Sequence, residues 1–273
     1  MTTWRERMTS LGVEPSKALG QNFLHDRGIV RRIAEAAGIE PGETALEIGP
    51  GLGILTEELA ARARRVVAVE LDRRLAAHLP EVMPANVEVV EGDALALDLA
   101  GLAGPRYSVV ANLPYSVGTA IVRRLQEAEP PPRVLTVMVQ REVAERMTAA
   151  PPEMSLLGVA VQFYGAPRVL FRIGGGAFIP PPRVESSVVR IETREPPLPR
   201  EEHAAFFRVV QAGFSQRRKQ LANALTSGLP AARDDVVAAL EAAGVRPEER
   251  AERLRVADWV AVYRALVADE VMS

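Results

Sequence analysis

Short apolar runs alternate in the first half of the chain with segments in which apolar residues recur every three or four positions. The runs are typical of buried strands, and the intervening segments are typical of amphipathic helices. The expected strands are 44–48, 65–70, 87–90, 109–111 and 133–140. Because helical segments follow these runs, the pattern predicts an α/β fold with a mostly parallel sheet and helices on both faces.

The second half of the chain changes from a mixed pattern to a purely helical one. Three further runs predict strands that close the sheet, the last ones antiparallel: 156–164, 168–173 and 184–192. After the proline-rich segment 195–199, the expected helices are 203–225, 234–243 and 257–268. The chain has 273 residues, which is long for one domain. We therefore expect a main domain, 1–196, with an N-terminal extension, and a small all-α domain, 197–273.

Three alternate glycines follow the first strand, in the sequence Glu47-Ile48-Gly49-Pro50-Gly51-Leu52-Gly53. Glycine is needed where the backbone takes positive φ or approaches a ligand closely. The spacing does not match the G-x-G-x-x-G turn of dinucleotide-binding proteins, and no Gly-Lys-Ser/Thr of a phosphate-binding loop follows. The turn has the form E-x-G-x-G-x-G, which suits a ligand that carries a sugar and an amino-acid tail.

Acidic residues stand at the ends of the next two strands. Glu70 ends the strand 65–70, where a nucleotide-binding α/β unit places the carboxylate that accepts ribose hydroxyls. Asp93 follows the strand 87–90 and can accept from an adenine amine. A surface acid after a strand is commonplace, but two at successive strand ends indicate a pocket for an adenosine-containing ligand without phosphates. S-adenosylmethionine meets that description.

The strand that ends at Ala111 runs into Asn112-Leu113-Pro114-Tyr115. Proline cannot continue a central ladder, and ligands of open α/β sheets bind beyond the carboxyl ends of the strands. Asn112 offers an amide that accepts from an amine, Pro114 stiffens the loop, and Tyr115 presents a ring on which a base can stack. The loop is a candidate site for the exocyclic amine of a nucleobase, although a plain strand-to-turn corner also suits these residues.

Two other segments allow two interpretations each. Residues 17–26 form either a loop that folds over a ligand or a plain capping segment, with Asp26 as the N-cap of a helix over 27–37. Phe178 lies between three glycines and three prolines. It is either the second wall of a base sandwich opposite Tyr115 or an ordinary buried residue.

The basic residues of the chain are a possible contact for nucleic acid. The net charge is only −2, but all except two of the 33 basic residues are arginine, and a near-neutral total can hide a basic face. The cluster Arg217, Arg218 and Lys219 either contacts an RNA backbone or complements a helix C-terminus.

The chain has no cysteine, which excludes disulfides and thiol nucleophiles, and its three scattered histidines make a metal site improbable. The N-terminus lacks the apolar core of a signal peptide, and no apolar run is long enough to span a bilayer. We expect a soluble, cytoplasmic protein without a metal.

The glycine turn, the strand-end acids and the Asn-Leu-Pro-Tyr loop resemble the motif series of S-adenosylmethionine-dependent methyltransferases that modify adenine amines in RNA. Three segments are similar to those of the small-subunit ribosomal RNA adenine dimethyltransferase family: 21–24, 178–189 and 214–225. The resemblance runs from about Lys17 to the C-terminal helices. One stretch, 153–158, departs from the family pattern of Tyr-Gly before a Leu-Ser strand, which puts only contacts made by this loop in doubt.

This resemblance implies a class I methyltransferase domain, Rossmann-like, at 1–196 and an RNA-contacting helical domain at 197–273. The implied cofactor is S-adenosyl-L-methionine, held by Asn22, Leu24, Gly49, Glu70, Asp93 and Asn112, to which the glycine turn adds Gly51. The implied catalytic residues are Asn112, Leu113, Pro114, Tyr115 and Phe178. The expected reaction is dimethylation of two adjacent adenosines near the 3′ end of 16S rRNA, by a monomer, during small-subunit biogenesis.

Three rival functions stay open. A large-subunit rRNA methyltransferase would share the pocket, although the segment 178–184 is more similar to the small-subunit form. A DNA amino-methyltransferase would need a large recognition domain, for which the chain has no room. A non-enzymatic assembly or transcription factor could keep the fold, but the intact loop 112–115 argues against lost activity.

Overall fold

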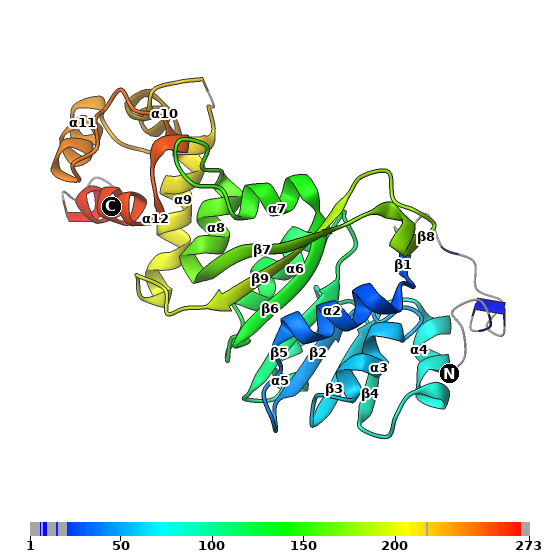
Figure 1. Cartoon of the computed structure of the whole chain (residues 1–273). Coiled ribbons are helices and arrows are strands. Elements are labelled where there is room, and N and C mark those ends of the chain that lie inside the picture. The colour runs from blue at the N-terminus through cyan, green and yellow to red at the C-terminus, as the bar shows by residue number, and fades with distance from the viewer. Residues whose placement is uncertain (1–5, 7, 10–14, 16–20, 217, 269–273) are drawn as a thin grey trace. The chain divides into compact units, whose positions relative to one another are not determined.

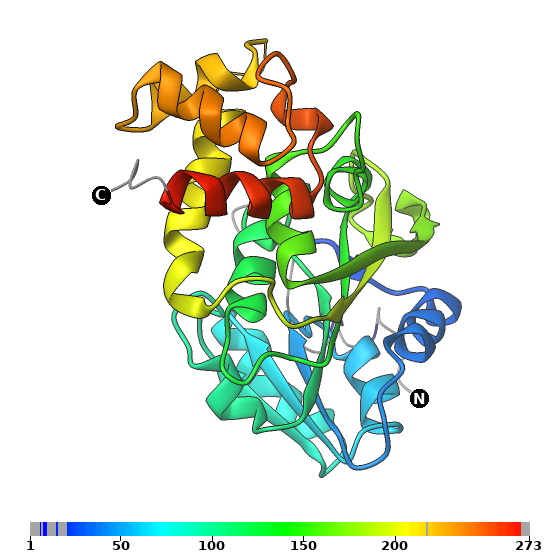
Figure 2. The same ribbon diagram turned by 90° about the vertical axis from the view of Figure 1, so that its left-hand side faces the viewer.

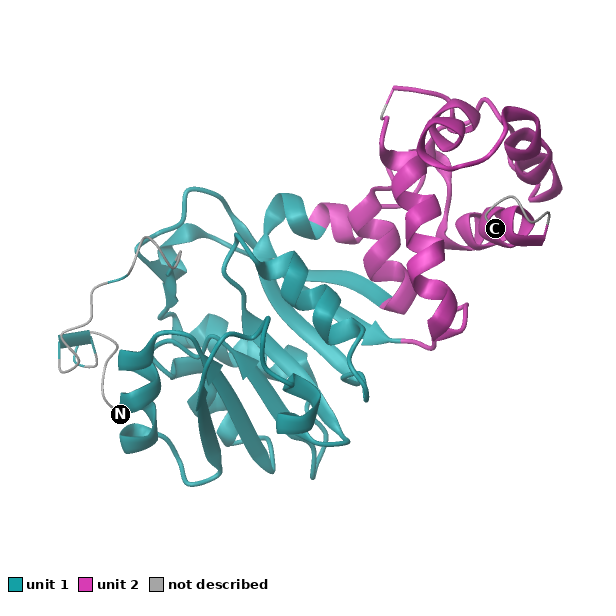
Figure 3. Cartoon of the chain, turned by 180° about the vertical axis from the view of Figure 1, so that it is seen from behind, with its two compact units in different colours: residues 1–144, 166–193 teal, residues 145–165, 194–273 magenta. Residues whose placement is uncertain are grey.

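The chain forms two compact units (Figure 3). A computed structural model describes residues 6, 8–9, 15, 21–216 and 218–268. Unit 1 consists of 1–144 and 166–193, and unit 2 consists of 145–165 and 194–273. Each unit is therefore assembled from two separate pieces of the chain.

Within the described residues, unit 1 is organised around a sheet of seven strands (Figure 1). In spatial order these are β4 (Val87–Glu91), β3 (Arg65–Glu70), β2 (Thr44–Ile48), β5 (Tyr107–Asn112), β6 (Val134–Gln140), β9 (Ser186–Thr193) and β7 (Gly165–Ile173). The first five run parallel, and β9 runs antiparallel to β6. This mixed, mostly parallel sheet confirms the predicted fold class and the antiparallel final strand.

The strand order decides where a ligand can bind. Because β2 lies between β3 and β5, the glycine turn after β2, Glu70 on β3 and Asn112 on β5 come together at one edge of the sheet. Their meeting depends only on the pairing of parallel strands, whose carboxyl ends share that edge.

A helix follows each of the parallel strands. These helices are α3 (Ile54–Ala60) after β2, α4 (Arg73–Val82) after β3, α5 (Leu99–Ala103) after β4, α6 (Gly118–Gln126) after β5 and α7 (Arg141–Met147) after β6. Ahead of them, α2 (Arg27–Ala37) packs against α3 and contacts β5, β6 and β9. Asp26 accepts from the Ile29 amide at 3.0 Å, which confirms it as the N-cap of α2. A small second sheet pairs β1 (Phe23–Leu24) with β8 (Phe178–Ile179).

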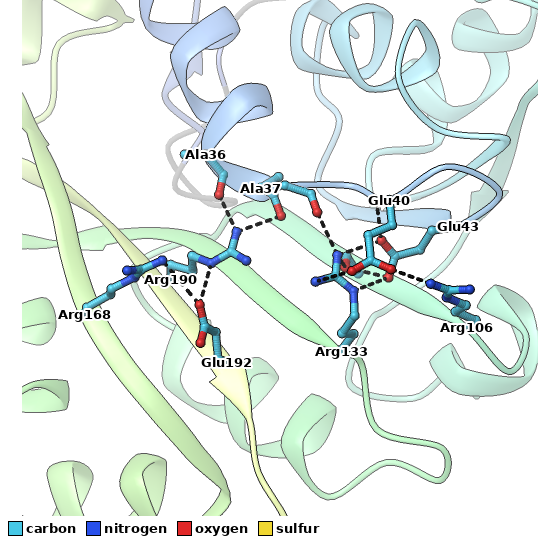
Figure 4. A network of polar contacts seen from close by, with 11 residues as sticks. Ala36, Ala37, Glu40, Glu43, Arg106, Arg133, Arg168, Arg190 and Glu192 are labelled. Carbon is cyan, nitrogen blue, oxygen red and sulfur yellow. Dashed lines mark hydrogen bonds and ion pairs between the residues drawn. The ribbon is translucent and has the colours of Figure 1, made fainter.

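The C-terminal end of α2 is tied to the sheet by Arg190 of β9 (Figure 4). Its Nη1 donates to the carbonyls of Ala36, at 2.6 Å, and Ala37, at 2.9 Å. Carbonyls in the last turn of a helix have no partner within the helix. The guanidinium therefore supplies donors that α2 itself lacks, and its positive charge suits the negative end of the helix dipole.

A second arginine, Arg133, joins the starts of several elements (Figure 4). Its Nε and Nη2 donate to the two carboxylate oxygens of Glu43, at 3.0 and 2.8 Å, and Nη2 also donates to the Gly38 carbonyl at 2.7 Å. Glu43 is fully buried and accepts from Ser108 as well. Burial would raise the pKa of Glu43, but hydrogen bonds from Arg133, the Glu40 amide and Ser108 outweigh it and hold that pKa below its ordinary value.

Removing the arginine from this pair should destabilise unit 1. Arg133→Met leaves a buried carboxylate without its charged partner, and we expect a loss of about 1–3 kcal/mol in unfolding free energy at neutral pH. A carboxylate with a lowered pKa contributes stability above its unfolded pKa and loses it as the pH falls through the folded value. The difference between wild type and variant should therefore shrink in acid, as measured by denaturant unfolding at several pH values.

Arg106→Met is the matched control, because Arg106 pairs with Glu40 at a site where both side chains are exposed. An exposed pair is worth about 0–1 kcal/mol. A loss for Arg133→Met no larger than that of the control would contradict a structural role for the buried pair.

Unit 2 is a bundle of helices (Figure 2). Its helices are α8 (Leu156–Tyr164), α9 (His203–Phe214), α10 (Leu221–Gly228), α11 (Arg233–Ala242) and α12 (Val256–Ala268). Aromatic side chains fill its core: Phe163 of α8 stacks on Phe206 of α9 with ring centroids 4.7 Å apart, and Trp259 is fully buried. None of the helices in the described ranges is both long and apolar enough to cross a membrane.

The prediction of a strand at 156–164 was wrong, because this segment is α8. Ser155 begins the helix by accepting from the Gly158 amide at 2.9 Å. An apolar run of this length has the composition of a buried strand and also of a buried helix, and periodicity cannot separate the two. The strands expected at 168–173 and 184–192 are confirmed as β7 and β9.

The single helix expected at 203–225 is also wrong, because it is interrupted between α9 and α10. Ser215 caps α9 with its hydroxyl, which donates to the Ala212 carbonyl at 2.7 Å. The Leu221 amide at the start of α10 donates instead to the Glu249 carbonyl at 2.7 Å. Tertiary hydrogen bonds thus replace helical ones at the break.

Candidate active site

A cleft of about 860 Å³, counting the part open to solvent, lies in unit 1 at the carboxyl ends of the parallel strands. Its walls come from the N-terminal segment, the glycine turn, the ends of β3, β4 and β5, and the loop that leads into α6. Of the predicted site residues, the structure brings nine to this cleft: Asn22, Gly49, Gly51, Glu70, Asp93, Asn112, Leu113, Pro114 and Tyr115.

The glycine turn has the left-handed backbone conformation that its three glycines predicted. Gly49, Gly51 and Gly53 all have positive φ, between 57° and 75°. A Cβ added to Gly51 would lie 3.0 Å from the ring of Phe23, so a side chain there would push the N-terminal segment away from the cleft. The turn therefore needs glycine both for conformation and for close approach.

Glu70 is held in one orientation by two backbone donors. One carboxylate oxygen accepts from the Gly51 amide at 3.0 Å, and the other accepts from the Asp72 amide at 2.9 Å. The side chain is only 5% exposed, and burial raises its pKa while the two amides work in the opposite direction. Each oxygen keeps a second lone pair, with which it can accept from a ribose hydroxyl.

A second buried acid, Glu47, stands next to the first. It lines a smaller adjoining cavity, together with Gly49 and Asn112. Burial and the neighbouring charge of Glu70 raise the pKa of Glu47 to about 8. The carboxyl is therefore largely protonated at neutral pH, which avoids two buried negative charges side by side.

Asn112 ends β5 and lines the cleft, and one hydrogen bond fixes the orientation of its amide. Its Nδ2 donates to the Asn22 carbonyl at 3.1 Å. Because the nitrogen is engaged there, Oδ1 forms the other branch of the amide and is an acceptor for a ligand. The same bond holds the N-terminal segment against the end of β5.

The backbone after Asn112 turns sharply into α6. The Leu113 amide donates to the Met138 carbonyl at 3.3 Å, and the Pro114 carbonyl accepts from the Gly118 amide at 2.9 Å. Tyr115 lies within this turn and is partly buried. Its hydroxyl shares a hydrogen bond of 2.8 Å with the hydroxyl of Ser186 on β9.

Two predicted site residues do not line the main cleft. Leu24 lines the smaller cavity beside Glu47. Phe178 pairs with Leu24 in the small sheet and is only 2% exposed, so its ring is packed in the core. Of the two interpretations of Phe178, the geometry matches the buried residue.

The other predicted contacts lie in different places. Asp93 is exposed at the cleft, and its Oδ1 accepts from the Leu95 amide at 2.8 Å. Arg218 and Lys219 are exposed in the turn between α9 and α10, in unit 2. Arg217 lies outside the described residues.

Sequence reasoning missed several residues of the cleft. Gln21 lines it and donates to the carboxylate of Asp72 at 3.3 Å, and Leu71, which is 56% exposed, lines it next to Glu70. An apolar residue directly after a strand-end acid is the signal that could have indicated Leu71. Ser186 had no such signal, because only the pairing of β9 with β6 brings it near Tyr115.

The family model for ribosomal RNA adenine dimethylase matches residues 14–267 of the chain. The chain belongs to this family. Ribosomal RNA small subunit methyltransferase A of Moorella thermoacetica is 44% identical over 270 residues, which cover 93% of each chain. The protein of the same name from Dehalococcoides mccartyi is 41% identical over 264 residues, covering 95% of this chain and 91% of the relative.

Two solved structures are similar over most of the chain. The 23S rRNA methyltransferase ErmE is 32% identical, with a TM-score of 0.73, and the match covers 90% of this chain and 100% of ErmE. A dimethyladenosine transferase from Plasmodium falciparum is 24% identical, also with a TM-score of 0.73, over 89% of this chain and 97% of the other. The second likeness supports the fold alone.

As a member of the ribosomal RNA adenine dimethylase family, the protein is a methyltransferase whose cofactor is S-adenosylmethionine. The cleft fits that group. Its described lining contains the carboxylates of Glu70 and Asp93 and no lysine or arginine, which suits a cationic nucleoside without phosphates.

Glu70 allows a direct test of this fit. Glu70→Gln removes the charge that strengthens hydrogen bonds to ribose hydroxyls, so S-adenosylmethionine binding should weaken by about 1.5–3 kcal/mol, roughly 10- to 150-fold in Kd. Calorimetric titration of wild type and variant measures this. Glu88→Gln, an exposed acid on β4 that pairs with Arg65, is the control and should bind like wild type. Equal affinities for all three proteins would remove Glu70 from the cofactor site.

Proposed function

We propose that the protein dimethylates the exocyclic amines of two adjacent adenosines near the 3′ end of 16S rRNA during small-subunit biogenesis. The observation that carries the proposal is that Asn112 lines the cofactor cleft with its amide nitrogen engaged by the Asn22 carbonyl, which leaves the amide oxygen as its acceptor for a ligand. The choice of the small subunit is supported by the names of relatives more than 40% identical over nearly the whole chain. We further propose that the protein acts as a monomer in the cytoplasm.

A large-subunit substrate is the second candidate, because the 23S rRNA methyltransferase ErmE shares 32% identity with this chain. Both activities require the same cleft and the same loop. The higher identity to the small-subunit relatives favours the first candidate.

In the proposed reaction, the residues of the loop prepare an adenine amine for attack. An adenine amine is a poor nucleophile because its lone pair is delocalised into the ring. Hydrogen bonds from its two N–H groups to Asn112 Oδ1 and the Leu113 carbonyl favour a pyramidal nitrogen that carries its own lone pair. Bound S-adenosylmethionine supplies an activated methyl group on a sulfonium. Asn112 Oδ1 and the Leu113 carbonyl would hold the nitrogen while it takes the methyl group, the carbon–sulfur electron pair staying with the sulfur of the cofactor, and while the surplus proton passes to solvent.

This chemistry places few demands on acid–base groups. The amine loses its proton readily once it has become cationic, so no strong base is needed near the loop. Positioning supplies most of the rate effect. The acids of the cleft, Glu70 and Asp93, accordingly have binding roles in the proposal.

Tyr115 is proposed to hold the target base. An adenosine must leave its stack to enter the cleft, which costs a few kcal/mol. Stacking on an aromatic ring is worth about 1–3 kcal/mol per base and offsets that cost. Because Phe178 is packed in the core, stacking in this proposal rests on Tyr115 alone within the described site.

Unit 2 is proposed to bind the RNA backbone. The turn between α9 and α10 exposes Arg218 and Lys219, and the sequence places Arg217 beside them. Phosphate contacts orient a protein on RNA without reading bases. We propose that residues 197–273 contact RNA and that residues 1–196 hold the cofactor and the reacting base.

Methyl transfer from labelled cofactor tests the substrate directly. The protein is incubated with small subunits that lack the modification and, separately, with large subunits, and the labelled nucleotides are mapped. We expect two adjacent labelled adenosines near the 3′ end of 16S rRNA. Label in 23S rRNA would support the second candidate, and no label in either particle would contradict both.

Variants of the loop should separate chemistry from base binding. Asn112→Ala should lower the rate of methyl transfer by about a hundredfold with little effect on RNA affinity, because the missing acceptor acts mainly in the transition state. Tyr115→Ala should lose much more activity than Tyr115→Phe, which keeps the ring. Single-turnover rates with saturating cofactor and RNA measure this step. A wild-type rate for Asn112→Ala, or equal rates for the two Tyr115 variants, would contradict the assigned roles.

The basic turn of unit 2 should control the salt dependence of RNA binding. Replacing Arg217, Arg218 and Lys219 by glutamine should weaken binding and reduce the slope of log K against log salt by roughly 0.7–0.9 for each phosphate that is no longer neutralised. Cofactor affinity should stay the same. Arg106→Gln, an exposed arginine of unit 1, is the control. A slope unchanged from wild type would assign the cluster to a structural role.

A further inference from the structure

The side chain of Tyr115 is not enclosed on all sides. Tyr115 is partly buried and lines the cofactor cleft, and with Gly118, Gln140 and Val143 it also lines a small hollow of about 210 Å³, counting the part open to solvent. An aromatic side chain that packing does not enclose completely can turn about its two side-chain torsions. A stacking platform, however, must hold its plane if the base above it is to be placed within a fraction of an ångström.

A hydrogen bond at the far end of the ring supplies the missing restraint. Within the described part of the chain, the partner of the Tyr115 hydroxyl is the hydroxyl of Ser186, 2.8 Å away. Ser186 is fully buried. Because the Ser186 hydroxyl is buried away from water, separating the two groups would leave it without this hydrogen bond.

Ser186 is itself fixed by the sheet. It begins β9 and pairs with Gln140 at the end of β6. The preceding residue, Glu185, accepts the Arg141 amide at 2.9 Å through its carbonyl and the Arg141 guanidinium at 3.0 Å through its carboxylate. The position of the hydroxyl is therefore set by the ladder on one side and by the start of α7 on the other.

We propose that Ser186 is a positioning residue for methyl transfer: its hydroxyl holds the Tyr115 ring in the plane on which the target adenine stacks. The proposal rests on the proposed function of Tyr115 and adds the group that orients it. Ser186 touches neither base nor cofactor in this role and acts only through Tyr115. Its contribution appears in the rate of transfer, because a tilted ring misplaces the amine relative to the methyl group.

Ser186→Ala should lower the single-turnover rate about two- to twelvefold, the range that one neutral hydrogen bond supports. S-adenosylmethionine affinity should not change. Ser187→Ala is the matched control, because Ser187 is an equally buried serine on the same strand whose side chain points to the opposite face of the sheet. Equal rates for wild type and Ser186→Ala, or an equal loss in the control, would overturn the proposal.

A double-mutant cycle distinguishes positioning from a general loss of structure. Tyr115→Phe and Ser186→Ala each break the same hydrogen bond, so the double variant should be no slower than the slower single variant. Independent effects would instead multiply. Multiplied losses would show that Ser186 acts by a route other than the Tyr115 hydroxyl and would overturn the proposal.

A third measurement needs no RNA. The chain has four tyrosines, and in protein carrying isotope-labelled tyrosine the ring signal of Tyr115 is the one missing from Tyr115→Phe. That signal should shift in Ser186→Ala and stay in place in Ser187→Ala. An unmoved signal would overturn the proposal even for an active enzyme. A shifted signal in a protein that methylates no rRNA would contradict the proposed function and leave the restraint itself supported.

Discussion

One buried carboxylate, Glu70, joins the two loops between which the cofactor cleft opens. It accepts from the Gly51 amide in the loop after β2 and from the Asp72 amide in the loop after β3. Because both oxygens are held, the acid cannot turn away from the cleft, and the glycine turn cannot relax without losing a buried acceptor.

Two further side chains extend this arrangement around the cleft. Asn112 ties the end of β5 to the N-terminal segment, and Tyr115 ties the following loop to β9 through Ser186. In each case a side chain at the end of one element reaches a different element. Polar contacts thus join the elements around the cleft, and these elements meet because of the order of strands in the sheet.

The strand β9 runs from the side of the sheet that holds the cleft, at the carboxyl ends of the parallel strands, to the side where those strands begin. It begins with Ser186 beside the reactive loop and ends at Thr193, whose amide donates to the Arg133 carbonyl at 3.1 Å. Between them, Arg190 holds the last carbonyls of α2. The candidate site thus lies at the carboxyl ends of the parallel strands, and the partly buried ion pair of Arg133 and Glu43 joins the starts of several elements.

The parts of the site that were predictable are those built from local sequence. Local sequence determines the conformation of the glycine turn, of the strand that ends in Glu70 and of the loop Asn-Leu-Pro-Tyr. Parallel pairing of the strands then brings these three segments together. Phe178 and the helix α8 were different. The burial of Phe178 depends on a two-residue pairing with β1, and α8 is helical because its apolar side chains pack on α9. Neither partner is visible in the local pattern.

Because unit 2 is built from two separate pieces of chain, a truncation at one position cannot remove it whole. A chain ending at residue 196 would keep α8 and lose α9, against which Phe163 packs. The aromatic face of α8 would then be exposed to solvent, and the shortened protein would have a new hydrophobic surface that favours aggregation. Trimming the C-terminal helices is therefore not equivalent to isolating the cofactor-binding part. A clean separation would also have to replace the excursion of residues 145–165 by a short connection from α7 to β7.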